Sequence, residues 1–227
     1  MDDERSWARR ALGAGLVVLA LSAISTAMRP SPCGALDPHY PPIVAFELAR
    51  SQGDLDAVFG AAPSACRDAM VLAMDRANTA DVAIFIPAYA LFVAGFFASF
   101  RARRPGLARA GAWLLGLGAL FDLVENACLF ALTPTLDASS LALALLPWMT
   151  GVKWCALALA AVPEALLLRD GGRLSKAGAA LALLAPIGTV AAMIRPDLFG
   201  RFLALSIVAA WVPCLVSVAV RARRAPA

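Results

Sequence analysis

The chain has a single histidine, two tyrosines and none of the short motifs that mark common soluble enzymes. That histidine, His39, lies among prolines, so a metal centre built from several histidines and a serine–histidine triad among the apolar segments are both excluded. Also absent are Cys-x-x-Cys, the phosphate-binding glycine–lysine loop, the dinucleotide glycine fingerprint and His-Glu-x-x-His. We therefore expect no resident metal and no cofactor.

Lysine is scarce as well, since only Lys153 and Lys176 stand among the 20 basic residues. The net charge of +4 does not indicate a nucleic-acid partner, because the basic residues form short clusters beside apolar runs. Such clusters are typical of the residues that set the topology of a membrane protein.

Long apolar runs are what the chain has in excess. Hydrophobic residues make up 61% of its 227 positions, against about 45–50% in soluble domains. The runs are about 20 residues long, which is the length that spans a bilayer. They predict one all-α domain over 1–227, a six-helix transmembrane bundle with the lipid bilayer as its main partner. The predicted helices are 11–28, 81–100, 107–132, 143–168, 177–194 and 202–220.

The first run has a second interpretation. A basic head before an apolar core also fits a secretory signal peptide. The run of about 18 residues is long for that purpose, and Ser25-Thr26-Ala27 is a poor cleavage site. Whether or not it is cleaved, the following segment is expected outside.

The basic clusters predict the orientation, because cytoplasmic loops are enriched in Lys and Arg. Both termini are expected to be cytoplasmic, in a cell (inner) membrane, with 29–80 as a mostly helical extracytoplasmic loop. The segments expected inside carry Arg5, Arg9, Arg10, Arg101, Arg103, Arg104, Arg109, Arg169, Arg173, Lys176, Arg221, Arg223 and Arg224. The link at 133–142 has none, and the tight turn expected at 195–201 has two.

The outer loop starts with a proline-rich stretch and continues as two amphipathic helices, 43–60 and 65–81, separated at Pro63. Cys33 and Cys66 are the only cysteines in it. Because that compartment is oxidising, we predict a disulfide between them. Glu47 and Arg50 are interpreted as part of a solvated helix face.

A polar cluster interrupts the apolar helices. Asp122, Glu125 and Asn126 follow the spacing i, i+3, i+4, which places them on one helix face. Lys153 lies in the next helix. Each ionisable group costs about 2.5–3.5 kcal/mol to insert, so these groups are expected to pair or to line a polar cavity.

Two more residues are expected near that level, in the outer half of the membrane: Tyr89 in the helix 81–100, with Asp81 above it. Gly111 and Gly118 continue the polar face and would allow a neighbouring helix to approach closely. Glu164, near the inner end of its helix, is expected to reach water or Arg169.

Part of this pattern resembles a family of uncharacterised bacterial multi-pass membrane proteins. The residues that carry the resemblance are Asp81 with Tyr89, Asp122-Leu-Val-Glu125-Asn126, Lys153-Trp154 and the loop segment Ala45-Phe46-Glu47-Leu48-Ala49. It covers about 43–168. It implies this layout and this choice of residues, and it implies no reaction.

Four functional interpretations remain open. The first is a binding protein for a small amphipathic or lipid-like ligand, with Asp81, Tyr89, Asp122, Glu125, Asn126 and Lys153 around its polar group. The apolar part of the ligand would lie along Phe85, Phe92 and Phe121. The others are an intramembrane proton-transfer or isomerase enzyme on a lipidic substrate, a proton-coupled transporter, and an ion pair that only locks two helices together.

Overall fold

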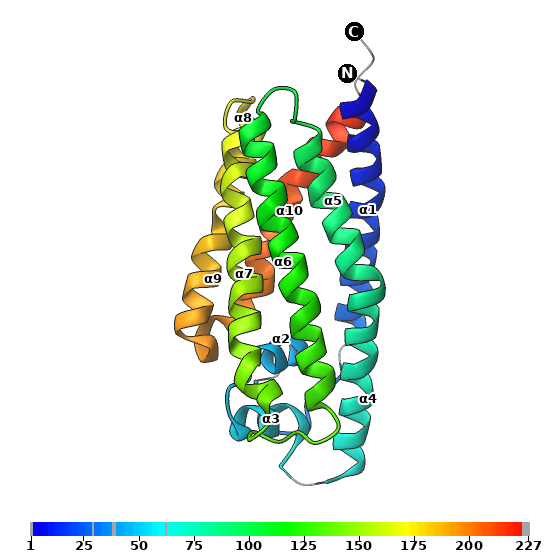
Figure 1. The fold of residues 1–227 in the computed structure, drawn as a ribbon, viewed down its shortest axis with the longest axis vertical. Helices are drawn as coiled ribbons and strands as arrows, with labels where there is room; N and C mark the ends of the chain where they lie inside the picture. Colours follow the sequence, from blue (N-terminus) through cyan, green and yellow to red (C-terminus); the bar gives the residue numbers. More distant parts are fainter. Residues whose placement is uncertain (1, 29, 38–39, 62, 224–227) are drawn as a thin grey trace.

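The computed structural model describes residues 2–28, 30–37, 40–61 and 63–223, and every regular element in these ranges is helical (Figure 1). His39 and Arg224 lie outside the described residues. Six helical stretches in this part of the chain are long and apolar enough to cross a membrane: Glu4–Ala27, Ala65–Ala98, Pro105–Leu132, Leu141–Leu168, Arg173–Ile194 and Leu198–Arg223. The prediction of an all-helical, multi-pass membrane protein is confirmed.

The first and the last described residues lie at the same end of the bundle (Figure 1). There the first helix, α1 (Asp2–Ala27), meets the last, α10 (Pro196–Arg223), and Arg5 donates a hydrogen bond to the carbonyl oxygen of Ala222 at 3.4 Å. We call this the terminal end of the bundle and the opposite one the loop end.

The second span differs from the prediction. The segment 65–81 is not a separate loop helix, because α4 (Ala65–Ala80) continues through a π-helical turn, η1 (Asp81–Phe85), into α5 (Ile86–Ala98). No proline or glycine stands between Ala65 and Ile86 to end the helix. The extra residue per turn lies at Asp81, and π-helical turns are frequent at functional sites.

The fifth and sixth spans also differ. The predicted helix 177–194 is broken at Leu183 into α8 (Arg173–Ala182) and α9 (Leu184–Ile194). Pro186 has no N–H to bond the carbonyl of Ala182, which explains the break. The turn expected at 195–201 is instead the beginning of α10. Pro196 is favourable as the first residue of this helix, because the backbone N–H that proline lacks would have no partner within the helix there.

The long helices α6 (Pro105–Leu132) and α7 (Leu141–Leu168) pack side by side (Figure 1). A methyl group on Gly118 would lie 2.7 Å from Leu157 of α7, and one on Gly111 would lie 2.2 Å from the ring of Phe97 on α5. The predicted close approach of a neighbouring helix is confirmed, and it occurs on two sides of α6, with α7 at Gly118 and with α5 at Gly111.

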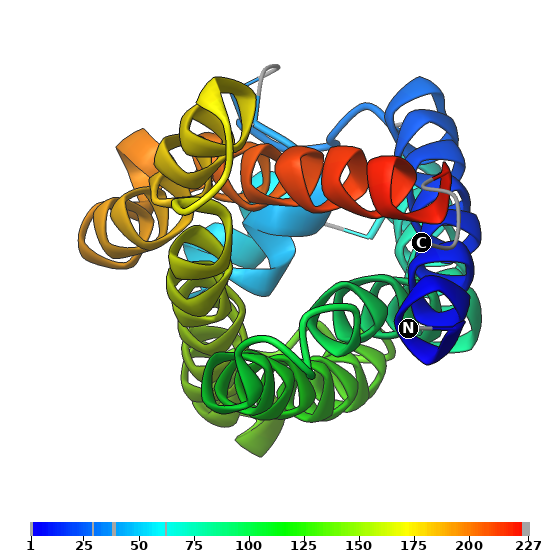
Figure 2. The ribbon, with the colours of Figure 1, turned by 90° about the horizontal axis from the view of Figure 1, so that it is seen from above.

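The loop end is closed by short helices with their own apolar core. Two of them, α2 (Pro42–Glu47) and α3 (Gln52–Phe59), pack with α4 and the ends of α6 and α7 around Phe46, Phe59 and Leu132. Ser51 and Ser64 cap α3 and α4. In the view from the terminal end, α2 lies within the ring of long helices, at its far end (Figure 2), in contact with α6, α7 and α10.

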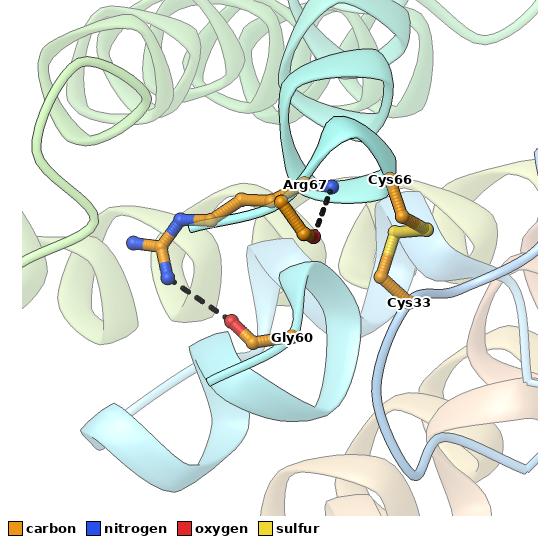
Figure 3. The surroundings of a disulfide bond; sticks show 5 residues. Cys33, Gly60, Cys66 and Arg67 are labelled. Carbon is orange, nitrogen blue, oxygen red and sulfur yellow. Dashed lines mark hydrogen bonds between the residues drawn. A yellow bond between two sulfur atoms is a disulfide. The ribbon is translucent and has the colours of Figure 1, made fainter. Parts of the chain in front are cut away.

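Cys33 and Cys66 form the predicted disulfide, which ties the proline-rich stretch to the start of α4 (Figure 3). Beside it, Arg67 donates a hydrogen bond to the carbonyl oxygen of Gly60 at 3.0 Å. The segment that carries α2 and α3 is thus fixed at both of its ends.

Candidate functional site: a buried acidic cluster

Lys153 of α7 is the centre of the polar cluster. Its ammonium donates a hydrogen bond to Oε2 of Glu125. It also forms ion pairs with Asp122 at 3.4 Å and with Glu47 at 3.2 Å. The Lys153 side chain is 3% exposed and that of Glu125 is fully buried. The predicted pairing of α6 and α7 is confirmed, and the lysine has three carboxylates around it instead of two.

The other predicted site residues lie on the far side of Asp122. Tyr89 donates its hydroxyl proton to Oδ2 of Asp122 at 2.9 Å. The amide nitrogen of Asn126 donates to Oδ2 of Asp81 at 2.8 Å and to the backbone oxygen of Asp122 at 3.0 Å. All six residues predicted for the site are therefore joined in one network that extends from α7 through α6 to η1 and α5.

Thr150 joins the cluster one turn before Lys153 and was not predicted. Its hydroxyl lies against two acceptors, the backbone oxygen of Glu47 at 2.9 Å and Oε1 of Glu125. A hydroxyl has one hydrogen to donate. Thr150 can therefore donate to only one of these two oxygens at a time.

Glu47 corrects the interpretation of a solvated loop face. It ends α2, its side chain is only 13% exposed, and it points at Lys153. Burial raises the pKa of the Glu47 carboxyl above its usual 4.5, and the charge of Lys153 opposes this rise. Arg50, in contrast, is exposed. Spacing within the loop gave no sign of this inward position.

The cluster is unbalanced in charge and in hydrogen bonds. Three acids, Glu47, Asp122 and Glu125, surround Lys153, and a fourth, Asp81, joins the cluster through Asn126. Asn126, 2% exposed, has no hydrogen-bond donor for its Oδ1 among the described residues. A buried excess of negative charge is unstable unless protons or another cation neutralise it. The site can therefore accept protons or a donor group.

Glu164 is the second correction. It does not pair with Arg169; it is 2% exposed, and in the described part of the chain it forms no ion pair. The thiol of Cys214 on α10 lies beside it, and a void of about 10 Å³ lined by Leu157 and Trp211 adjoins it. Such a void is large enough for roughly one water molecule.

Two of the three aromatic residues expected along a ligand chain, Phe85 and Phe92, pack against Trp211 of α10. Phe85 and Phe92 lie 6.3 and 6.4 Å from Trp211, ring centre to ring centre, and Trp211 stacks on Tyr89 at 5.5 Å. These ring contacts hold Tyr89 in the position from which its hydroxyl donates to Asp122.

No family model matches this chain, and no curated protein or solved structure shows significant similarity to it.

Proposed function

We propose that this is an inner-membrane binding protein with cytoplasmic termini, whose acidic cluster in the outer half holds the polar group of a small amphipathic molecule. The single observation that supports the proposal is the charge excess of the cluster, in which Glu47, Asp122 and Glu125 share the one lysine and Asp81 joins them through Asn126. The polar group that best completes such a site is a cationic hydrogen-bond donor, such as an amine.

The arrangement of the cluster favours Asp81 as the point where the polar group of the ligand enters. Asp81 is half-buried, whereas Asp122, Glu125 and Lys153 are buried. Among the described residues its side chain bonds to Asn126, whose Oδ1 has no donor there. An amine placed between Asp81 and Asn126 would satisfy that oxygen and reduce the charge excess, while protons would compete for the same acids.

Two tryptophans make the proposal testable. The Trp154 ring lies 4.6 Å from the Lys153 ammonium, and Trp211 stacks on Tyr89. We expect dodecylamine to change the tryptophan fluorescence of the purified protein in nanodiscs in a saturable way. Dodecyl sulfate and dodecanol, with the same chain, should not.

Variants separate binding from partition into the lipid. Asp122→Asn and Glu47→Gln should weaken the dodecylamine signal, whereas Asp68→Asn, on the exposed start of α4, should leave it unchanged. Equal signals from all three compounds, or from all the variants, would rule out the proposed site.

Proton-coupled transport is the second candidate, and Glu164 is the observation that favours it. A transporter needs polar groups in the inner half, and Glu164 places a buried acid there, eleven residues or roughly 16 Å beyond Lys153 along α7. Proteoliposomes with an internal pH dye provide the test. Proton flux that Glu164→Gln abolishes would favour transport, and the absence of flux in the unaltered protein would exclude it.

A further inference from the structure

A second candidate site lies at the terminal end, apart from the acidic cluster. The structure has a cavity of about 710 Å³ there, between the end of α7, the helix α8 and the second half of α10. Figure 2 looks onto this end of the bundle. The volume falls within the usual range of small-molecule sites, about 300–1,000 Å³. Leu168, on its wall, is fifteen residues or about 22 Å along α7 from Lys153.

The inner wall of the cavity is apolar. It is formed by Leu168, Leu174 and Leu181 on one side and by Val212 and Val216 on the other. From Val212 to Arg221 it follows α10 for nine residues, about 13 Å. One leaflet of the hydrocarbon core is about 15 Å thick, so the depth suits an acyl chain.

The rim of the cavity is basic. Arg103, Arg104 and Arg221 line it, with Asp170 as its acid. Asp170 pairs with Arg104 at 2.7 Å. The Arg221 guanidinium lies 3.6 Å from the ring centre of Phe100 and donates to the carbonyl oxygen of Ser99 at 2.9 Å. The exposed Arg103 forms no ion pair with any described residue.

We propose that this cavity binds an anionic phospholipid of the leaflet at the terminal end. An acyl chain lies between α8 and α10, and the phosphate lies at Arg103. The apolar depth selects a lipid chain, and the net positive rim selects an anionic headgroup over a zwitterionic one. This second site does not depend on the function proposed for the acidic cluster.

Native mass spectrometry of the protein from mixed micelles tests the proposal, with equal amounts of dioleoylphosphatidylglycerol and dioleoylphosphatidylcholine. We expect preferential retention of one phosphatidylglycerol. Arg103→Gln should lower its retention about fivefold, since one arginine near a membrane surface contributes about 1 kcal/mol to anionic lipid binding. The pair Arg103→Gln/Arg104→Gln should lower it further.

Two comparisons decide the result. Arg9→Gln/Arg109→Gln removes two exposed arginines near the same end that do not line the cavity, and it should retain the lipid. Ser217→Trp fills the cavity from α10 and should release the lipid even with every arginine present. Unchanged retention in the Arg103 variants, or an equal loss in the Arg9/Arg109 control, would show unspecific surface lipid and overturn the proposal. If Ser217→Trp fails to fold, the arginine variants alone still decide.

Discussion

The two halves of the bundle bury acids in opposite ways. Toward the loop end, Glu125, Asp122 and Glu47 surround the charge of Lys153, and Tyr89 and Asn126 supply further hydrogen bonds. Toward the terminal end, Glu164 lies among apolar side chains beside Cys214, and no described residue forms an ion pair with it. A buried acid without a cationic neighbour is stable in its uncharged form, whereas a paired one can remain ionised. The single helix α7 thus carries Lys153 in a charged cluster and Glu164 in apolar surroundings.

The two ends differ in packing as well. The loop end is covered by α2 and α3 and cross-linked by a disulfide. The terminal end is hollow, with an arginine rim. The polar cluster therefore lies near the covered end, whereas the cavity lies at the opposite end of the bundle.

The largest effect is expected from Lys153→Met. It leaves three buried carboxylates without their cation, and breaking a buried pair costs about 3–5 kcal/mol. The free energy of unfolding, measured in detergent with a chemical denaturant, should fall by that amount. Lys176→Met, at an exposed position of α8, is the control and should change nothing. An unaltered stability of Lys153→Met would mean that water already screens the cluster.

Removing the disulfide tests whether the packing of α2 and α3 on the loop end depends on the Cys33–Cys66 bridge. Cys33→Ser/Cys66→Ser should lower the free energy of unfolding by about 2–4 kcal/mol, because the bridge closes a long loop. The unaltered protein should show no free thiol at these two positions after denaturing alkylation and mass spectrometry. Full alkylation of both would contradict the bridge.

Gly111→Ala tests the close approach of α6 to α5. The added methyl group meets the Phe97 ring in the core, and such overpacking costs about 1–3 kcal/mol. Gly116→Ala is the matched control on the same helix, since its new methyl group has nothing within 4 Å. There we expect a gain of about 0.5–1 kcal/mol in the free energy of unfolding, because alanine favours the helix over glycine. Equal effects at the two positions would refute the close packing.

The smallest effect is a pH dependence from Glu47. Its pKa is raised in the folded protein, so the folded state binds the proton more tightly than the unfolded one. The stabilisation is complete below the usual pKa of 4.5 and is lost as the pH rises through the raised value. The difference in thermal midpoint between the unaltered protein and Glu47→Gln should follow this course from pH 4 to pH 8. A difference that does not vary with pH would show that Glu47 is not buried at the cluster.

The membrane class and most of the site were predictable from the sequence because their signals are local. Runs of apolar residues mark spans, and the spacing of Asp122, Glu125 and Asn126 places them on one face without any tertiary information. The glycines of α6 and the two loop cysteines were interpreted correctly for the same kind of reason.

The errors concern residues whose surroundings come from distant parts of the chain. Glu47 has the local pattern of a surface residue, and only the position of α2 between α6, α7 and α10 buries it beside Lys153. Glu164 was expected to reach water, but α10 closes the bundle over it through Cys214 and Trp211. Thr150 carries no distinctive local signal at all.

The sequence by itself determined that the chain spans a membrane several times and that one level of it is polar, because hydrophobicity and helical periodicity are properties of consecutive residues. Only the tertiary structure decided how many acids share Lys153, where a lone acid is buried, and which end is hollow. These features depend on which helices meet, and charges, hydrogen bonds and cavities arise between elements that are far apart along the chain.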